Sequence, residues 1–375
     1  MFCSPLKVGT SDVAPVFSGS YRPDEVQFLL KPLQIEPMQD VHEKERLIQS
    51  GARHYSEMLG VERQPSAAYL ALFHVAVQSN AAIMARDVWR LAAQIFVARP
   101  GGATLVSLAR AGTPVGVLLH HVLREFFGCT AAHYSISIIR DRGIDEVALN
   151  YVCARHAPES LVFIDGWTGK GAIANELSQS LRAYYAHTGI KLADELYVVC
   201  DLAGLASAAG STQDYLIPSA ILNATISGLV SRSVLNEQIG PADFHGCRYY
   251  SEFAAQDRSV WFIEQMMAAV HALPAHERVL PPPHDRAKLQ AQSNALLARL
   301  MREFEIDDRN YIKPGIGEAT RSLLRRTPRV LILSDVDAPQ VQHLRLLAQE
   351  SAVPIQFDPE LRLHAATIIQ RLSDA

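Results

Sequence analysis

One stretch of the chain combines residue types that could bind an anion. The apolar run Leu161–Ile164 ends at Asp165, and Gly-Trp-Thr-Gly-Lys-Gly follows. Glycines before a helix allow backbone N–H groups to converge on an anion, and a lysine adds positive charge. A carboxylate at a strand end could accept hydrogen bonds from hydroxyl groups or coordinate a metal ion. We therefore predict a phosphate-binding loop beside Asp165, with contacts from Thr168, Gly169, Lys170 and Gly171.

This turn does not match the Walker A loop of nucleotide-binding proteins. A Walker A loop has the form Gly-x-x-x-x-Gly-Lys-Ser/Thr, in which the last hydroxyl binds the metal. Here only Trp167 and Thr168 separate Gly166 from Gly169, and a glycine follows the lysine. The alternative to an anion site is a tight strand-to-helix turn that binds nothing.

Cations and glycines also follow other apolar runs or precede helices. Arginine suits phosphate because its planar guanidinium donates paired hydrogen bonds and keeps its charge. For each segment the alternative is an ordinary loop or a purely structural contact. The candidate contacts are Arg110, Gly112, Thr113, Arg140, Arg142, Arg232, Lys313, Gly315, Gly317 and Arg321. We expect the loop Lys313–Arg321 to fold back towards Asp165 and share one cleft with it.

The elements that would position these residues are strands alternating with helices. The predicted strands are 104–109, 133–139, 161–165 and 196–201, and the predicted helices are 115–127, 146–155 and 172–185. This order predicts a doubly wound parallel sheet, in which ligands bind at the carboxyl ends of the strands. We expect an N-terminal helical region over 1–100, an α/β core over 101–240, and a helical and small α/β unit over 241–375. Within the first region we expect helices near 24–30, over 41–59 and over 66–97, the last broken near Asn80.

Composition restricts the function classes. The chain has 375 residues, of which 49% are hydrophobic, and a net charge of −4, so it offers no overall attraction to nucleic acid. Its scattered cysteines form no CxxC pair, which favours reduced thiols over disulfides or a zinc site. They are Cys3, Cys129, Cys153, Cys200 and Cys247. We see no signal peptide and no apolar run near membrane-spanning length, and we expect a cytoplasmic protein.

The Asp165 loop resembles the phosphoribosyl-diphosphate loop of type I phosphoribosyltransferases. In that family the acid contacts ribose hydroxyls, the Thr/Gly turn binds the 5′-phosphate, and a loop placed like Arg110–Thr113 receives the diphosphate. This chain has a single acid where the family usually has a pair, and its loop is shorter by about one residue.

The chain as a whole resembles the StiP family of phosphoribosyltransferase-like proteins, which are encoded beside bacterial tellurium-resistance genes. Its members are described as cysteine proteases or as phosphoribosyltransferases that build a nucleoside-like metabolite. The segments that carry the resemblance are 17–21, 107–114, 163–173, 217–220, 227–232 and 313–321.

The resemblance implies a type I phosphoribosyltransferase-like core and Mg²⁺-assisted transfer of ribose 5-phosphate from phosphoribosyl diphosphate. The implied catalytic residues are Asp165, which also holds the metal, Arg110, Arg140 and Arg142. We expect a small phosphorylated sugar or nucleotide as the ligand, allow for a homodimer, and expect no nucleic-acid or membrane partner.

Two alternatives remain open. A cysteine protease needs a histidine beside its thiol, and the sequence offers His245 near Cys247 and His156 near Cys153, without a papain or caspase signature. A non-catalytic nucleotide-sensing protein would keep the fold without the chemistry.

Overall fold

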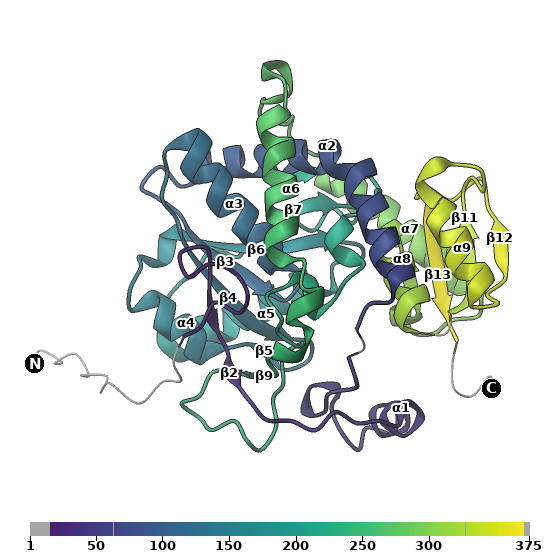
Figure 1. Ribbon diagram of the computed structural model, residues 1–375, viewed down its shortest axis with the longest axis horizontal. Helices are drawn as coiled ribbons and strands as arrows, with labels where there is room; N and C mark the ends of the chain where they lie inside the picture. Colours follow the sequence, from purple (N-terminus) through teal and green to yellow (C-terminus); the bar gives the residue numbers. More distant parts are fainter. Residues whose placement is uncertain (1–15, 63, 327, 371–375) are drawn as a thin grey trace, which may run out of the picture.

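A computed structural model describes residues 16–62, 64–326 and 328–370 of the chain (Figure 1). Its large sheet has seven strands, in the order β1-β4-β3-β6-β7-β8, with β5 paired to β4. All neighbours in this order run parallel, and only β5 is antiparallel. The strands are β1 (Gln27–Leu29), β3 (Thr104–Ala109), β4 (Ala132–Ile139), β5 (Gly143–Ile144), β6 (Leu161–Thr168), β7 (Leu196–Asp201) and β8 (Ala208–Ser211).

Helices cover both faces of this sheet, and each face has its own buried apolar cluster. One cluster contains side chains of α2 (Ala67–Ala98), α3 (Gly112–Phe127) and α6 (Ser259–Ala272). The other contains side chains of α4 (Glu146–Cys153) and α5 (Ala172–Thr188). The strands are buried on both sides, which explains their continuous apolar runs. The predicted α/β class with a parallel sheet is confirmed.

The N-terminal segment differs from the prediction in two places. The helix expected at 24–30 is wrong, because these residues form the edge strand β1. Phe28 and Leu29 are both fully buried but belong to opposite core clusters, an alternation that only a strand provides. The next helix, α1 (Val41–Gln49), is shorter than predicted and is followed by Gly51, whose positive φ of 70° is typical of a helix end.

Helix α2 runs unbroken past Asn80, whose side-chain amide donates to the carbonyl oxygen of Ala76 at 3.0 Å. It is the one helix of the described ranges that is long and apolar enough to cross a membrane, with a mean hydropathy of 1.3 over its apolar window. This differs from the expectation that no apolar run approaches membrane-spanning length. In the fold, 22% of that window is buried, and the later residues Met84 to Ile95 supply much of the core beside α3.

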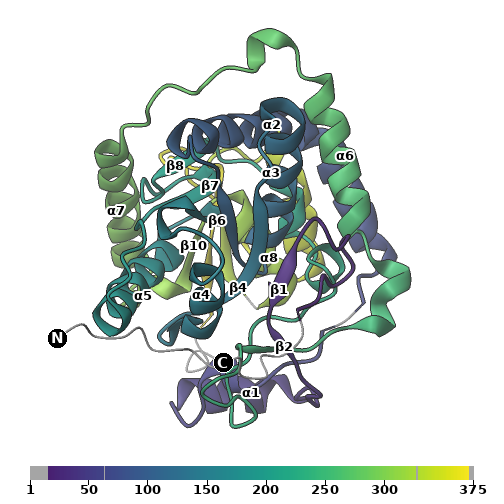
Figure 2. The ribbon, with the colours of Figure 1, turned by 90° about the vertical axis from the view of Figure 1, so that its left-hand side faces the viewer.

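The C-terminal residues form a second, four-stranded sheet with helices beside it, on one side of the molecule in Figure 1. Its strand order is β10 (Ile312–Pro314), β13 (Ala365–Ile369), β11 (Pro328–Leu333) and β12 (Ile355–Phe357), and its helices are α7 (Arg286–Glu303), α8 (Ile316–Arg325) and α9 (Gln342–Glu350). A proline-rich segment crosses from α6 to α7 in Figure 2. The short strands β2 (Lys31–Pro32) and β9 (Gly246–Cys247) pair with each other.

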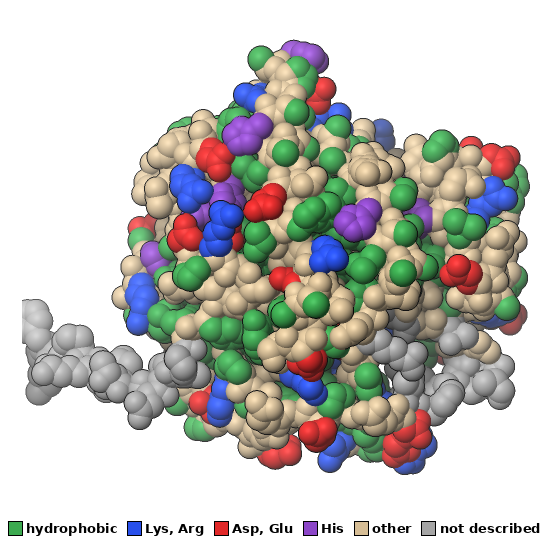
Figure 3. All heavy atoms as spheres, in the orientation of Figure 1, with side chains coloured by type: hydrophobic (Ala, Val, Ile, Leu, Met, Phe, Trp, Pro, Cys, Tyr) green, Lys and Arg blue, Asp and Glu red, His purple; other side chains and the backbone are tan. Residues whose placement is uncertain are grey.

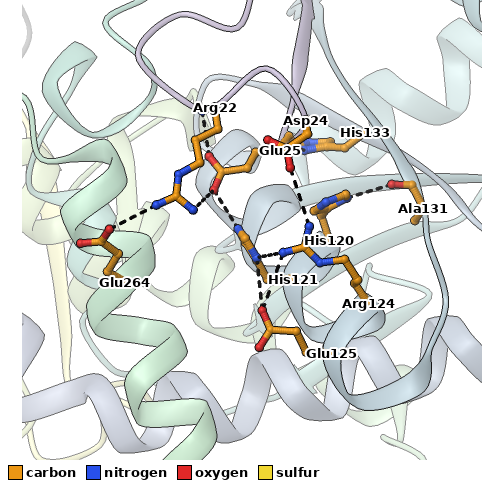
Figure 4. A network of polar contacts seen from close by, with 10 residues as sticks. All are labelled: Arg22, Asp24, Glu25, His120, His121, Arg124, Glu125, Ala131, His133 and Glu264. Atoms are coloured by element: carbon orange, nitrogen blue, oxygen red, sulfur yellow. Dashed lines mark hydrogen bonds and ion pairs between the residues drawn. The ribbon is translucent and has the colours of Figure 1, made fainter.

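A partly buried polar network joins the N-terminal segment to α3 and α6 (Figure 4). The Oε1 atom of Glu25 lies 2.9 Å from Nε2 of His121, and the Glu25 carbonyl oxygen lies 2.8 Å from Nδ1 of His133. Arg22 approaches both Glu25 and Glu264 on α6. These contacts hold the residues before β1 against the core. On the outer face seen in Figure 3, basic and acidic side chains are interspersed rather than segregated.

Candidate functional site

The carboxyl ends of β3, β4 and β6 open into a large cleft. Its volume is about 2190 Å³, and it lies where open α/β sheets bind their ligands. The walls come from the N-terminal segment, the sheet edge, the irregular stretch after β8 and the C-terminal unit. Lining residues occur within 39–69, 108–114, 138–142, 165–173, 219–232, 250–253, 308–326 and 369–370.

The cleft is cationic although the chain as a whole is acidic. Among the described residues that line it, ten are Lys or Arg and six are Asp or Glu, and none is a cysteine. A local excess of positive charge inside a concave surface favours an anionic ligand.

The loop after β6 is shorter than the sequence suggested, because the strand continues to Thr168 and α5 starts at Ala172. Gly171 between them has a positive φ of 79°, and a Cβ atom there would collide with the side chain of Leu205. Glycine is therefore required at this turn. Asp165 is only 9% exposed, and burial raises the pKa of its carboxyl group to about 6.

The hydroxyl of Thr168 has a structural partner. It donates to Oδ1 of Asp201, at the end of the neighbouring strand β7. Asp201 also accepts from the backbone N–H groups of the next loop, at Ala203, Gly204 and Ala206. Its proton is therefore used to hold the adjacent loop, and the predicted ligand contact of Thr168 stays a prediction that would require this hydroxyl to release Asp201.

Lys170 meets the C-terminal unit. Its Nζ atom donates to the carbonyl oxygens of Arg309 and Ile312, at 3.1 and 3.2 Å. Burial, followed by the charge of Lys313 on β10, lowers the pKa of Lys170 to about 7. Burial also lowers the pKa of Lys313. Two lysines from distant parts of the chain therefore lie together in the cleft.

The loop Lys313–Arg321 lines the same cleft as the Asp165 loop, which is the arrangement that the sequence analysis expected. The guanidinium of Arg321 lies 5.4 Å from the centre of the Trp167 ring, and burial lowers its pKa. A Cβ atom at Gly317 would meet the Trp167 ring at an ordinary contact distance of 3.6 Å, so packing against this ring does not require the glycine. Gly315 takes a positive φ of 87° at the start of α8.

Arg110 is already paired. Its Nη1 atom lies 2.9 and 3.0 Å from the carboxylate oxygens of Glu62, and Nη2 donates to Oδ1 of Asn223 at 3.1 Å. Glu62 therefore compensates the charge of Arg110, and the implied role of Arg110 in receiving a diphosphate stays a prediction that would require a rearrangement of this pair. Sequence reasoning missed Glu62, because nothing in a loop 48 residues away marks it as a partner.

Gly112 and Thr113 serve packing. The Thr113 hydroxyl is fully buried and lies 2.7 Å from the hydroxyl of Ser135 on β4. Gly112 touches the backbone of Ile164 and Asp165, where a Cβ atom would clash. The contacts of Gly112 and Thr113 in the fold are thus between α3 and the sheet, and the predicted ligand contacts of these two residues stay predictions.

Two other arginines surround Tyr55, a cleft residue that the sequence analysis did not single out. The guanidinium of Arg232 lies 5.3 Å and that of Arg140 5.9 Å from the centre of its ring. Arg232 donates to the carbonyl oxygen of Met58, while its buried Nη1 atom has no partner. Burial, followed by the charge of nearby Arg110, lowers the pKa of Arg232. Arg142, by contrast, forms a half-exposed ion pair with Glu57 at 3.1 Å.

None of the four described cysteines forms a hydrogen bond with a histidine. Cys200 donates to the carbonyl oxygen of Gln213, and its burial raises its pKa. Burial also raises the pKa of Cys153, and that of Cys247 to about 12.

The two histidines that the sequence offered as partners bind elsewhere. Nδ1 of His245 lies 2.8 Å from the Ser137 hydroxyl, and Nε2 of His156 lies 2.9 Å from the Tyr134 hydroxyl. Cys129 is half-buried. Cys3 lies outside the described residues.

Comparisons with known proteins give a family for most of the chain. Residues 19–267 match the model of the family described as "Tellurite-like stress resistance cysteine protease StiP", and residues 291–371 match the PELOTA RNA binding domain. A relative named "Cysteine protease StiP", from Acinetobacter baylyi, is 42% identical over 367 residues, which cover 95% of either chain. Among solved structures, a hypoxanthine phosphoribosyltransferase of Trypanosoma cruzi matches with a TM-score of 0.27 and 13% identity, over 36% of this chain and 81% of that one. The chain belongs to the StiP family, whose description is that of an enzyme, a stress-resistance cysteine protease.

Proposed function

We propose that the cleft binds a small phosphorylated sugar or nucleotide and acts on it in the manner of a phosphoribosyltransferase. The observation that carries this proposal is a set of half-buried cations that form no ion pair within 4 Å among the described residues, Lys170, Lys313, Arg232 and Arg321. A partly desolvated charge without an opposite charge beside it is costly, and binding of an anion would remove that cost.

The proposed roles follow from the contacts that each side chain still offers. Lys313 and Arg321 on one wall, and Arg232 on the other, would bind phosphate oxygens. Asp165, which titrates near pH 6, is ionised at neutral pH and would accept hydrogen bonds from ribose hydroxyls. In the transfer reaction diphosphate leaves and the ribose carbon becomes oxocarbenium-like. The protein then contributes position and charge compensation.

The expected Mg²⁺ fits this cleft only if the phosphates of the ligand bind it together with the protein. The described residues contain no group of three or more His, Cys, Asp or Glu side chains that could hold a metal by themselves. Asp165 offers one carboxylate, and Mg²⁺ is commonly bound by one or two carboxylates together with substrate phosphates. When bound in that way, it would offset the charge of the leaving diphosphate.

The second candidate function is proteolysis by a cysteine, and the comparisons favour it over the transferase. Both the family description and the curated relative name a cysteine protease. The chemistry needs a thiolate, a histidine to activate it and a group to orient that histidine. The half-buried Cys129 and Cys153 are the most accessible described thiols, and either would need a histidine brought to it.

One titration experiment separates these functions. We would follow tryptophan fluorescence, because Trp167 lines the cleft, while adding phosphoribosyl diphosphate, ribose 5-phosphate or adenosine monophosphate, with and without Mg²⁺. Saturable binding of a phosphorylated ribose supports the proposal. Binding without release of diphosphate in the presence of candidate acceptors would indicate a nucleotide sensor. No binding, together with iodoacetamide-sensitive hydrolysis of casein, would replace the proposal with the protease.

A short RNA oligonucleotide belongs in the same screen, because residues 291–371 match a family described as RNA binding. We propose that the ligand is a small molecule and that the protein acts in the cytoplasm without a membrane or nucleic-acid partner. RNA binding tighter than that of the mononucleotide, and competing with it, would contradict that part of the proposal.

A further inference from the structure

The carboxylate of Glu62 lies in a group of donors that can hold an anion. Its two oxygens lie 3.0 and 2.9 Å from Nη1 of Arg110, and its Oε1 atom also accepts from the backbone N–H of Ala224 at 2.6 Å. Asn223 orients the arginine, because its Oδ1 atom accepts from Nη2 at 3.1 Å. A guanidinium and a backbone N–H that converge on one oxyanion are also the donors that bind phosphate.

This ion pair lies where a ligand of the sheet would bind. Arg110 directly follows β3, at the carboxyl edge that open α/β sheets use for their ligands. Arg110, Glu62 and Asn223 all line the cleft, and the side chains of Arg110 and Glu62 are 16% and 13% exposed. The anion at this position therefore comes from the chain itself.

The backbone around Glu62 is loosely attached. Leu59 is the last firm anchor before it, since Leu59 is buried and its carbonyl oxygen accepts from the N–H of Met38 at 2.7 Å. Among the described residues of 61–65, none forms a backbone–backbone hydrogen bond, and Val61 is 44% exposed. The polar contacts of Glu62 are those of its side chain, so its carboxylate can leave Arg110 without breaking a helix or strand.

The same short segment reaches two other arginines of the cleft. Oε1 of Glu57 lies 3.1 Å from Nη2 of Arg142, and the carbonyl oxygen of Met58 accepts from Arg232. Residues 57–62 thus place two carboxylates and a carbonyl oxygen on cleft arginines. Of these contacts, the pair of Glu62 with Arg110 is the most buried ion pair.

We propose that Glu62 occupies an oxyanion site formed by Arg110 and the Ala224 N–H, and that a phosphate or diphosphate group of the ligand displaces it. Glu62 then competes with the ligand from within the chain. The ribose part of the ligand rests on the proposed function of the cleft, whereas the oxyanion site depends only on the contacts of Arg110, Glu62 and Ala224.

Such competition lowers the affinity for the ligand. The apparent affinity falls in proportion to the fraction of molecules in which the site is free, so a site that is free in about 1–10% of molecules binds about tenfold to a hundredfold more weakly. A phosphate group can displace the carboxylate because it carries a charge of about −1.5 to −2 at neutral pH, against −1 for the carboxylate.

Replacement of the competing carboxylate tests this assignment. We would titrate the full-length protein and Glu62→Gln with phosphoribosyl diphosphate, ribose 5-phosphate and inorganic pyrophosphate by calorimetry. Glutamine keeps an oxygen for the Ala224 N–H but loses the charge that holds Arg110. We expect Glu62→Gln to bind at least one probe about tenfold to a hundredfold more tightly. A gain with ribose 5-phosphate identifies a phosphate site, and a gain confined to the other two probes identifies a diphosphate site.

Two controls separate this pair from a general change of charge. Glu318→Gln removes the same charge from the same cleft, and among the described residues Glu318 has no ion pair, so the affinity should change by less than about threefold. In an Arg110→Met background, Glu62→Gln should no longer raise the affinity. A gain that persists there would overturn the proposal.

A second variant guards against a loss of folding, which urea denaturation would detect. Glu62→Asp keeps the charge but shortens the side chain by one methylene group, and it should tighten binding several-fold. If the native protein binds a phosphorylated ribose as tightly as both variants or more tightly, the proposed function stands and the competition by Glu62 is refuted. If pyrophosphate binds Glu62→Gln more tightly but no phosphorylated ribose binds, the oxyanion site stands and the proposed function fails. Absence of binding by every probe would refute both.

Discussion

Two polar regions of this molecule differ in how their charges are balanced. In the network around Glu25, the carboxylates of Asp24, Glu25, Glu125 and Glu264 each lie within 4 Å of an arginine or histidine (Figure 4). In the cleft, the cations outnumber the carboxylates, and Arg232 keeps a buried Nη1 atom without a partner. Both regions are rich in titratable side chains. Only the second leaves charge for another molecule to neutralise.

This contrast separates structural from ligand-binding charge. The pKa of Glu25 shows it: burial alone would raise the value, but the hydrogen bonds from His121 and from the backbone of Arg22 lower it overall. In the cleft the balance has the opposite result, because burial dominates and lowers the pKa values of Lys170, Lys313 and Arg321. The first arrangement stabilises the fold by itself, whereas the second gains stability when an anion binds.

The largest effect is expected where the balanced network is broken. Glu25→Ala removes a carboxylate whose side chain is 3% exposed and leaves His121 and Arg22 without it. The free energy of unfolding should fall by about 3 kcal/mol, measured by urea denaturation at pH 7. Asp24→Ala is the control, because Asp24 is exposed and its contact with Arg124 is 3.8 Å long, so its loss should cost less than about 1 kcal/mol.

The pKa shift of Glu25 also determines the direction in which the stability of the protein changes with pH. Its pKa is lower in the folded than in the unfolded chain, so its stabilisation is present above the unfolded value and is lost as the pH falls through the folded value. The native protein should therefore lose stability relative to Glu25→Gln below about pH 4. Parallel curves for the two proteins would contradict the pairing with His121.

In the cleft, removal of a cation should weaken ligand binding without lowering stability, in contrast to the removal of Glu25. Arg321→Met should weaken binding of a phosphorylated ribose by about 1.5–3 kcal/mol, or roughly ten- to a hundredfold, while stability stays unchanged or rises. Titration of Trp167 fluorescence and urea denaturation measure the two quantities. Arg302→Met, on the exposed side of α7, is the matched control and should alter neither. Loss of stability without loss of affinity would place Arg321 with the structural charges.

A smaller effect is expected at Asp165, the carboxylate of the cleft. Its folded pKa of about 6 lies above its ordinary value of 3.8, so its contribution to stability is full at low pH and is lost as the pH rises through 6. Asp165→Asn should therefore be more stable than the native protein at pH 7.5, by less than about 3 kcal/mol, which is the upper limit for a shift of this size, and equally stable at pH 3.5. Thermal unfolding at the two pH values measures this. An equal gain or loss at both would show that the carboxylate is not destabilised by burial.

Local sequence patterns predicted the strands and turns that form the cleft. They did not predict which side chains pair with one another there. The apolar run 104–109 is β3 to the residue, and the glycines around Asp165 and Lys313 correctly marked two turns that line one cleft. Strand ends and glycine turns are encoded within a few neighbouring residues, so a single sequence reveals them. The partners Glu62 of Arg110 and Asp201 of Thr168 come from separate segments, and only the folded sheet and loops bring them together.

The same limit explains the differences at the N-terminus. β1 has only three residues and forms because β4 offers an edge, which no pattern near residue 27 records. Tyr55 lies in an irregular segment, and its position between Arg140 and Arg232 depends on three distant parts of the chain.

The smallest effect on ligand binding in the cleft is expected from replacement of the cysteines. This prediction bears directly on the protease alternative. No described cysteine lines the cleft, and Cys200 and Cys247 are buried thiols whose pKa values burial raises. Because the thiolate is the reactive form, both should resist iodoacetamide at pH 7 in the folded protein. Replacement of each cysteine by serine, Cys3 included, should leave the affinity for a phosphorylated ribose within twofold. One thiol that reacts far faster than a free cysteine, and whose serine variant loses proteolysis, would instead assign the activity to that thiol and leave the cationic cleft a separate role.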